Sequence, residues 1–314
     1  MKPQISVIIC THNPWLAYLN QVLSALQGQT LPVQQWELIV VDNASAQSLA
    51  SRIDLSWHPA ARLVREERLG LTAARLSGFQ AARGDLLVYV DDDNVLDANY
   101  LTQVLQIFTE FEGLGAIGGK SLPEFEVAPK PWVSEFYKVL ALRDFGDEPL
   151  VHMGSFGTLS QNTYPDFAPA GIGLAVRRQA FLSYTQWVTA DCRRLALGRT
   201  GNQLTSGEDN DIILTLLNAG WGVGYFPQLQ LKHLIPARRL QRDYLGQLNR
   251  AACRSWVRVM DIHGIRVWQK IPSSTLVLRK AKAFFAYRAW QDAAAYVHWQ
   301  GACGTFEGLA SLSN

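Results

Sequence analysis

The sequence predicts an α/β fold built on a mostly parallel, doubly wound sheet, and three observations lead to this prediction. Short runs rich in Val, Ile and Leu alternate with helical patterns through the first 120 residues. The runs are apolar throughout, as expected of strands buried on both faces of a parallel sheet. Three of the runs end in clusters of polar residues. Because such sheets bind their ligands beyond the carboxyl ends of the strands, these clusters mark the expected site.

The elements of the first half follow in a regular order. Strands are expected at ISVIIC (5–10), WELIVVD (36–42), DLLVYVD (85–91) and GAIGG (115–119). Helices are expected between them, over residues 16–27, 71–82 and 100–111. The polar clusters that follow the first three strands are THN (11–13), DNAS (42–45) and DDDN (91–94). Alternating strand and helix patterns of this kind predict a sheet with helices on both faces.

The second half is less regular. A Pro-rich, aromatic stretch follows Gly119, and residues 146–169 are expected to form a loop. A strand that leads into a helix is expected at GIGLAVRRQAF (171–181), and a further helix has Ser206 as its expected N-cap and ends at Gly220. After these come a strand GVGYFP (222–227), the segment LQLKHLIP (229–236) and two basic, amphipathic helices at about 238–262 and 275–299.

Charge is distributed unevenly along the chain. The net charge is +2, and the content of 18% charged and 48% hydrophobic residues is that of an ordinary globular protein. The region from Lys232 to Arg288 holds thirteen Lys or Arg and two Asp residues, a net charge of +11, so the remainder carries −9. A basic segment of this size suits an anionic partner. Nucleic acid is not expected, because no nucleic-acid-binding motif accompanies the charge.

Cysteine usage and hydropathy predict a cytoplasmic protein. The four cysteines, at positions 10, 192, 253 and 303, form no CxxC pair and are too sparse for a disulfide framework. The first residues enter an expected strand without the apolar stretch and cleavage site of a secretory leader. The sequence has no window of about 18 uncharged apolar residues, so we expect no membrane-spanning helix.

Three adjacent aspartates, Asp91 to Asp93, end the expected strand 85–91. Carboxylates side by side repel by roughly 1 kcal/mol per pair at about 4 Å in water, so a cation is expected to offset them. Mg²⁺ or Mn²⁺ fits, because it takes one or two carboxylates together with water and phosphate oxygens. The alternative is a solvated turn that caps the helix starting near Asp97. Asp42 ends a neighbouring strand, and two converging acidic strand ends favour a metal and nucleotide site over the turn.

Five segments, in order along the chain, carry a family resemblance. They are ISVIICTHN, WELIVVDNAS, ARGDLLVYVDDDN, PAGIGLAVRR and SGEDNDI, within residues 5–235. Together they resemble a family 2 glycosyltransferase of the GT-A fold. The resemblance implies an inverting, metal-dependent enzyme that moves a sugar from a nucleotide-diphosphate donor, a UDP-sugar first, to a hydroxyl of a saccharide or lipid-linked acceptor. It is nearest to bacterial enzymes of surface or extracellular polysaccharide synthesis.

The resemblance also implies how the chain is organised. We expect a GT-A catalytic domain over residues 1–236, with a nucleotide-binding half (1–120) and an acceptor-binding half (121–236). Residues 237–314 are expected to form a basic helical extension.

The resemblance assigns donor-binding residues as well. The implied metal ligands are Asp93, Asp91 and His233, with Asp91–Asp93 as a DxD-type motif. The nucleotide and its diphosphate are expected to contact Thr11, Asn13, Asp42, Arg75, Asp92 and either Arg238 or Arg239, with Asp42 on the base. Arg75 lies in ARLSG, where Leu76 stands in place of the Asn that is usual in the family.

An acidic pair, Glu208 and Asp209, opens the expected helix of the second half. The helix dipole stabilises ionised carboxylates at this end. By resemblance, Asp209 is the catalytic base and Glu208 orients the acceptor hydroxyl. The alternative is a helix cap with no part in the chemistry.

Glycines and aromatic residues of the second half each allow two interpretations. Gly171 and Gly173 either let the backbone approach the sugar or acceptor, or pack closely against neighbouring elements. Four aromatic residues could form a platform for the acceptor, because sugars stack on aromatic rings. The favoured interpretation is that they pack in the core. These residues are Trp132, Phe136, Tyr137 and Trp187.

Two other function classes compete. A sugar-nucleotidyltransferase also binds nucleotide phosphates at aspartates of an α/β sheet. It normally has a Gly-rich, basic phosphate loop after its first strand, and CTHNPW (10–15) lacks one. A non-catalytic nucleotide-sugar-binding module needs no base, so the acidic pair at 208–209 argues against it.

The basic helix expected at 238–262 raises the question of a membrane. Its apolar residues share one face, and arginines crowd the others; the apolar set is Leu240, Tyr244, Leu245, Leu248, Ala252 and Val259. We expect the helix either to pack on the catalytic domain or to attach peripherally to an anionic membrane, at the inner face of the plasma membrane.

Overall fold

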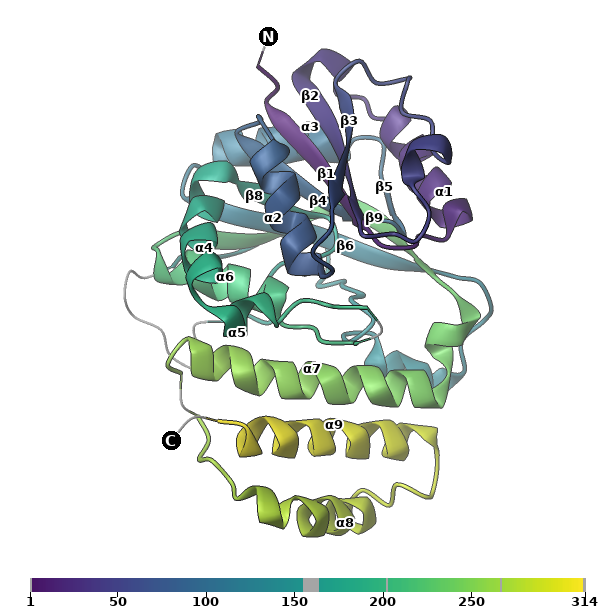
Figure 1. The fold of residues 1–314 in the computed structure, drawn as a ribbon, viewed down its shortest axis with the longest axis vertical. Helices are drawn as coiled ribbons and strands as arrows, with labels where there is room; N and C mark the ends of the chain where they lie inside the picture. Colours follow the sequence, from purple (N-terminus) through teal and green to yellow (C-terminus); the bar gives the residue numbers. More distant parts are fainter. Residues whose placement is uncertain (1, 155–163, 202, 266, 313–314) are drawn as a thin grey trace.

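The structure is a computed structural model that describes residues 2–154, 164–201, 203–265 and 267–312. One sheet runs through this part of the chain, in the strand order β3-β2-β1-β4-β8-β6-β9-β5, with β7 beside β9 (Figure 1). The strands are β1 (Ile5–Thr11), β2 (Trp36–Asn43), β3 (Ala61–Glu66), β4 (Leu86–Asp91), β5 (Asn94–Leu96), β6 (Leu114–Phe125), β7 (Leu150–His152), β8 (Leu174–Arg177) and β9 (Gly222–Ile235). The α-helices are α1 (Leu16–Gln27), α2 (Leu71–Ala81), α3 (Tyr100–Glu110), α4 (Arg178–Ala190), α5 (Cys192–Leu195), α6 (Glu208–Asn218), α7 (Arg242–Ile262), α8 (Leu276–Ala286) and α9 (Ala293–Ala310).

The predicted α/β fold is confirmed, and its parallel part lies in the first half. Strands β3, β2, β1 and β4 pair in parallel, and every residue of β1 and β2 is buried. Beyond β4 the sheet is mixed, because β8 runs antiparallel to both β4 and β6, and β5 and β7 run antiparallel to β9. Parallel pairing returns only between β6 and β9. The sheet is therefore less uniformly parallel than the sequence predicts.

Helices cover both faces of the sheet, as expected of a doubly wound fold. Side chains of α1 and α3, such as Leu19 and Phe108, form one apolar core with the β1–β2–β4 strands. Helices α2, α4 and α6 cover the other face, where Phe181 and Ile213 belong to a second core. Strand β6 continues across residue 120, so the two predicted halves of the catalytic domain share one sheet. The division of that domain stays a prediction.

Several predicted elements differ in detail. Helix α6 begins after Gly207, not Ser206, and no side chain caps it. Strand β3 was not predicted, and β7 lies inside the expected loop 146–169, of which residues 155–163 are outside the described part. The segments 222–227 and 229–236 form the single strand β9.

The expected helix 275–299 is two helices, α8 and α9. The break lies at Arg288, whose backbone φ is +49°, and at Asp292, whose carboxylate accepts a hydrogen bond from the Ala295 amide at 2.8 Å and caps α9. The pattern of apolar and basic residues continues through the break, which is why the sequence alone predicts one helix.

Three helices stack below the sheet in the order α7, α9, α8, with α8 farthest from it (Figure 1). Helices α7 and α9 approach so closely that a Cβ at Gly304 would lie 2.0 Å from the Arg250 carbonyl oxygen, so glycine is required there. The apolar face of α7, including Leu245 and Leu248, is buried against Val133, Phe136 and α9. The packing alternative for residues 238–262 is therefore confirmed, and the apolar face of α7 is not available to a membrane. Within the described ranges, no helix is long and apolar enough to cross a bilayer.

Candidate active site

The carboxyl ends of β1, β2 and β4 bring the predicted polar clusters together. Thr11 is the register partner of Asp42, and Cys10 is the partner of Asp91. The Thr11 hydroxyl donates a hydrogen bond to the Asp92 carboxylate. Parallel pairing places all three strand ends at one edge of the sheet, where ligands of such sheets bind.

Burial shapes the electrostatics of the aspartate run. Burial raises the pKa of Asp92 to about 7, and the neighbouring Asp93 carboxylate adds to the rise. Burial also raises the pKa of Asp91, although the Arg75 guanidinium opposes the shift. For Asp93 the burial effect is outweighed by His233 and Arg239, which together hold its pKa well below the usual range. Asp93 is thus the most strongly ionised carboxylate of the three.

Asp93 contacts two basic side chains from the chain's later segments. Arg239 donates to its Oδ2 at 2.9 Å, and His233 Nε2 lies 3.4 Å from the same oxygen. Strand β9 positions His233, because that residue is the register partner of Asn94 on β5. The Nδ1 atom of His233 is buried and has no hydrogen-bond partner among the described residues. A buried, unsatisfied ring nitrogen at an acidic cluster is suited to meet a ligand.

The residues predicted to hold Mg²⁺ or Mn²⁺ fit a site that a diphosphate completes. Among the described residues, no three His, Cys, Asp or Glu side chains converge as a self-sufficient metal site. A divalent cation bound together with a diphosphate needs only one or two carboxylates from the protein, because phosphate and water oxygens fill its other positions. Asp91 and Asp93 offer those carboxylates, and His233 lies beside them with Nε2 3.4 Å from Asp93.

Arg75 joins the two sides of the site. It is 3% exposed and extends from α2 to form an ion pair with Glu208 on α6. Its second terminal nitrogen donates to the Gly171 carbonyl oxygen at 2.9 Å and lies 3.8 Å from Asp91. Burial lowers the pKa of Arg75, but Glu208 and Asp91 raise it more, so the guanidinium stays charged. The ring of Tyr89 packs against the same guanidinium, 5.3 Å from its centroid.

The acidic pair at the start of α6 divides into two environments. Glu208 is buried, and burial raises its pKa to about 7 although Arg75 opposes the rise. Asp209 is half-buried and accepts hydrogen bonds from the amides of Gly171 at 3.1 Å and Asn210 at 2.9 Å. The first turn of α6 directs the helix dipole at both carboxylates. Glu208 is therefore the acid of the pair that has a cationic partner, and the Asp209 carboxylate accepts from backbone amides.

A cavity of 1110 Å³ encloses these groups, larger than the usual site for one small ligand. Strand ends of the sheet form one side and helix α7 the other. Of the predicted site residues, its lining includes Thr11, Arg75, Asp91, Asp92, Asp93, Gly171, Glu208, Asp209, His233 and Arg239. The cavity thus gathers both the predicted donor residues and the predicted catalytic pair.

Four predicted site residues lie outside the cavity lining. Asp42 is 1% exposed, and its carboxylate is held by the Ser45 amide at 3.1 Å and Arg65 at 2.8 Å. Gly173 packs against Tyr100, whose hydroxyl donates to its carbonyl oxygen at 2.5 Å, which agrees with the packing alternative. Asn13 and Arg238 line a smaller neighbouring pocket. Arg239, the alternative to Arg238, is the one of the two that lines the main cavity.

Three of the four aromatic residues follow the favoured alternative, core packing, and Trp187 follows neither alternative. Trp132, Phe136 and Tyr137 belong to the core beneath α7 and α9. Trp187 is 58% exposed on α4 and does not line the cavity.

Two cavity-lining cations were missed by sequence reasoning. Within the described residues, Arg199 has no hydrogen-bonding or ion-pairing partner for its side chain, and it acts electrostatically on Asp91 and Asp93. In the part of the chain that the structure describes, Arg143 donates to the carbonyl oxygens of Lys138 and Leu142, at 3.0 and 3.2 Å, and its buried Nε has no partner there. Neither belongs to a motif; both lie in irregular segments, so no periodicity marks them.

Comparison with known proteins agrees with this geometry. The family model "Glycosyl transferase family 2" matches residues 6–180. A Haloferax volcanii protein named glucosyl-dolichyl phosphate glucuronosyltransferase is 23% identical over 252 residues, which cover 77% of this chain and 72% of that protein. Glycosyltransferase AglE of the same organism is 31% identical over 94 residues, 29% of this chain and 31% of its own length.

Solved structures show the same fold. The crystal structure of Staphylococcus aureus TarS residues 1–349 superposes with a TM-score of 0.51 at 12% identity, covering 99% of this chain and 90% of that one. The family match covers more than half of the chain and includes the strand ends that carry the aspartates. This chain belongs to glycosyltransferase family 2 and has the GT-A fold.

Proposed function

We propose that the enzyme transfers a sugar from a nucleotide-diphosphate donor, a UDP-sugar first, to a hydroxyl of a saccharide or lipid-linked acceptor, with inversion at the anomeric carbon. The observation that carries the proposal is the shared cavity, because the acidic run at 91–93 and Asp209 both line it. A transfer needs both ends of such a site: one end neutralises the leaving diphosphate and the other accepts the acceptor's proton.

The donor end is proposed at Thr11, Asp91–Asp93, His233 and Arg239. Family membership supports a nucleotide sugar, and a structure of S. aureus TarS with the same fold is a complex with UDP. Asn13 and Asp42 are proposed to bind the nucleoside. Asp42 does not line the cavity, so its part would be to position Ser45 and Arg65, which donate to its carboxylate. Arg239 and Arg199 are the cations best placed for the diphosphate, and Arg238 is a weaker candidate because it faces the neighbouring pocket.

Metal dependence is part of the proposal. Asp93 with Asp91 would hold Mg²⁺ or Mn²⁺, with His233 beside them. When bound, the ion supplies Lewis-acid neutralisation of the diphosphate charge. The chain's own contribution is to present one firmly ionised carboxylate, since His233 and Arg239 keep the pKa of Asp93 low. Arg239 would then exchange Asp93 for a phosphate oxygen of the donor.

Asp209 is proposed as the base. Its two amide hydrogen bonds fix the carboxylate while leaving lone pairs for the acceptor hydroxyl. The acceptor oxygen loses its proton to Asp209 as it attacks the anomeric carbon, and the bond from that carbon to the diphosphate oxygen breaks. One displacement of this kind inverts the centre, and general-base assistance is worth about 10² to 10⁴ in rate. Glu208 contributes by holding Arg75, and through it the Gly171 segment that the base contacts.

The acceptor end is proposed along α7. Tyr244, Leu248 and Trp256 of that helix line the cavity, and so does Arg143. This mixture of apolar surface and an unpaired cation suits a lipid-linked or anionic saccharide acceptor. The name of the H. volcanii relative, which includes a dolichyl phosphate, points the same way. A role in bacterial surface or extracellular polysaccharide synthesis is proposed on this basis.

The four free cysteines agree with a reducing cytoplasm, which we propose as the compartment.

A donor screen tests the proposal. Binding of UDP-, GDP- and dTDP-sugars should be measured by calorimetry with and without Mn²⁺, followed by hydrolysis of the bound donor as a readout that needs no acceptor. We expect one nucleotide class to bind in a metal-dependent manner and to be slowly hydrolysed. Binding of free nucleoside triphosphates with release of pyrophosphate would instead make the enzyme a nucleotidyltransferase.

A further inference from the structure

The outer face of α8 is an exposed apolar surface. Val277 is 81% exposed, Leu278 74% and Phe285 67%, values far above those of buried core residues. Positions 277, 278, 281 and 285 fall on one side of an α-helix, so these side chains form a single stripe with Ala281. Just past the helix, Trp290 and Tyr287 are 59% and 48% exposed. Contiguous apolar exposure of this kind marks an interaction site.

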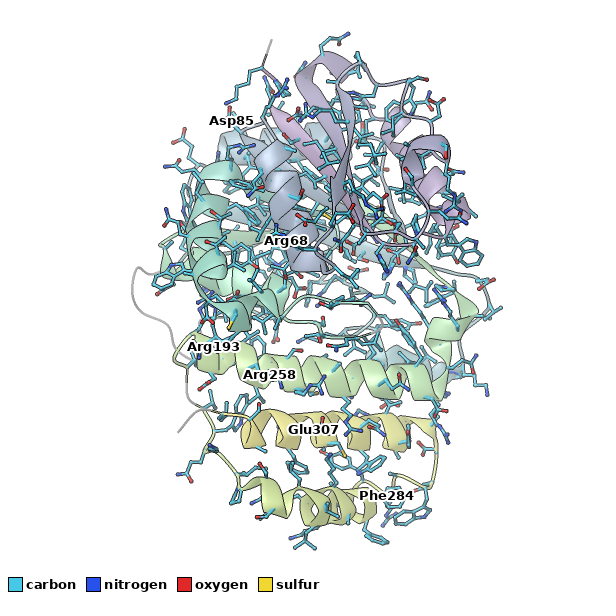
Figure 2. All side chains as sticks on the ribbon, viewed as in Figure 1. Arg68, Asp85, Arg193, Arg258, Phe284 and Glu307 are labelled. Carbon is cyan, nitrogen blue, oxygen red and sulfur yellow. The ribbon has the colours of Figure 1, made fainter. Side chains whose placement is uncertain are left out.

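Other side chains of α8 fix the helix to the rest of the protein. The Phe284 ring packs edge-on against Trp299 of α9, with centroids 5.2 Å apart, and Ala283 is buried. Lys280 forms a 2.6 Å ion pair with Glu307 of α9, and its carbonyl oxygen accepts from the Trp299 indole at 3.0 Å. Figure 2 shows Phe284 and Glu307 in this lower layer, on α8 and α9 respectively. The exposed stripe is therefore held outward on an anchored helix.

The charge around the stripe has one sign. No Asp or Glu occurs between Asp261 and Asp292 in the sequence. The helix and the turn after it carry Arg279, Lys282 and Arg288, and among the described residues none of the three has a carboxylate within ion-pairing distance. An anionic surface complements these cations, whereas a second copy of the same helix would bring like charges together.

We propose that residues 277–290 dock the enzyme on an anionic lipid bilayer. An amphipathic helix with an apolar face, basic flanks and aromatic residues at its edge lies in the headgroup region, where Trp and Tyr are favoured and basic residues meet anionic lipids. The stripe on α8 has each of these features, and its side chains face away from the protein. The surface differs from the one that the sequence pattern of residues 238–262 suggests, because α9 and the sheet domain cover α7. The docking does not depend on the proposed donor or acceptor.

Co-sedimentation with vesicles tests this directly. Phosphatidylcholine vesicles with and without phosphatidylglycerol should be compared at low and high salt, with no substrate present. We expect recovery on the anionic vesicles only, reduced by salt. The double variant Leu278→Glu, Phe285→Glu should lower the partition coefficient at least about tenfold, because it removes apolar contact and adds repulsion. Leu182→Glu is the matched control: Leu182 is 44% exposed on α4, and binding should be unchanged.

A second variant separates charge from apolar contact. Arg279→Glu with Lys282→Glu should weaken binding about tenfold or more to anionic vesicles and leave the melting temperature unchanged, because both side chains are exposed. Wild-type binding to neither vesicle type, or equal binding of wild type and both α8 variants, would overturn the proposal. The proposal would also be overturned if wild type is a dimer without vesicles and the Leu278→Glu, Phe285→Glu variant is a monomer. A second copy of the chain would then cover this face.

Discussion

Arg75 and Glu208 form a buried ion pair that joins α2 to α6 across the base of the cavity. The guanidinium also lies 3.8 Å from Asp91 and donates to the Gly171 carbonyl oxygen at 2.9 Å. Gly171 in turn donates to Asp209. One buried cation therefore sets the relative positions of the proposed metal-binding strand end and the proposed base.

Removing Arg75 should destabilise the protein strongly. Arg75→Gln leaves the Glu208 carboxylate buried without a charged partner, and breaking a buried pair on one side costs about 3–5 kcal/mol. The double variant Arg75→Gln, Glu208→Gln removes both charges and should recover part of that loss. Urea unfolding measures all three free energies. A loss below about 1 kcal/mol for the single variant, or a double variant less stable than it, would show that the pair does not hold the two helices.

Glu208 should make stability depend on pH in the ligand-free enzyme. Burial raises its folded-state pKa to about 7 from 4.5, so between these values the folded protein binds more protons than the unfolded chain. Stability should therefore fall as pH rises through this window, by on the order of 3 kcal/mol relative to Glu208→Gln, which does not titrate. Unfolding free energies of both proteins across the window provide the test. The raised pKa would be contradicted if the stability of wild type relative to Glu208→Gln stayed constant, or increased, as the pH rises.

Adjacent arginines should differ in their effect on donor binding. Arg239 contacts Asp93 and lines the cavity, whereas Arg238 is exposed beside the smaller pocket. Arg239→Gln should weaken UDP binding by about 1.5–3 kcal/mol, the range for a hydrogen bond to a charged group. Arg238→Gln is the matched control and should bind within about twofold of wild type by calorimetry. Equal losses in both variants would mean that the diphosphate spans both pockets.

Asp93 should carry the metal dependence of donor binding. In Asp93→Asn the most strongly ionised carboxylate of the run is lost, so UDP affinity should no longer increase when Mn²⁺ is added. Asp97→Asn, in an exposed residue that follows the same run, is the control and should keep the metal effect. Calorimetric titrations with and without Mn²⁺ give both answers. Metal-enhanced affinity that survives in Asp93→Asn would exclude Asp93 as the ligand.

Continuous apolar strands were predictable from the sequence because burial on both faces leaves a one-dimensional signal. Strands β1, β2 and β4 are of this kind, and the polar residues at their ends could be located from them. In strand β3 (ARLVRE), at the edge of the sheet, apolar residues are interrupted by charged ones. Strands β5 and β7 are each three residues long. None of these three strands leaves such a signal. The antiparallel pairings of β8 are long-range and have no local pattern.

The candidate site was predictable where motifs lie on regular elements. The aspartate run at 91–93 and the acidic pair at 208–209 line the same cavity. Choosing Arg239 over Arg238 needed the structure, because neighbouring residues differ only in the direction of their side chains. Arg143 and Arg199 lie in irregular segments, and only the fold brings them to the cavity.

Turnover of Asp209→Asn is the most direct test of the account, because its central claim is that Asp209 deprotonates the acceptor. The substitution keeps the size of the side chain and removes the base. Donor Kd should stay within about twofold of wild type, and kcat should fall by roughly 10² or more. Asp166→Asn, another acid that lines the cavity, is the control and should turn over normally. Near wild-type kcat in Asp209→Asn, measured on protein that binds donor normally, would contradict the claim and leave Asp209 as a residue of the helix start alone.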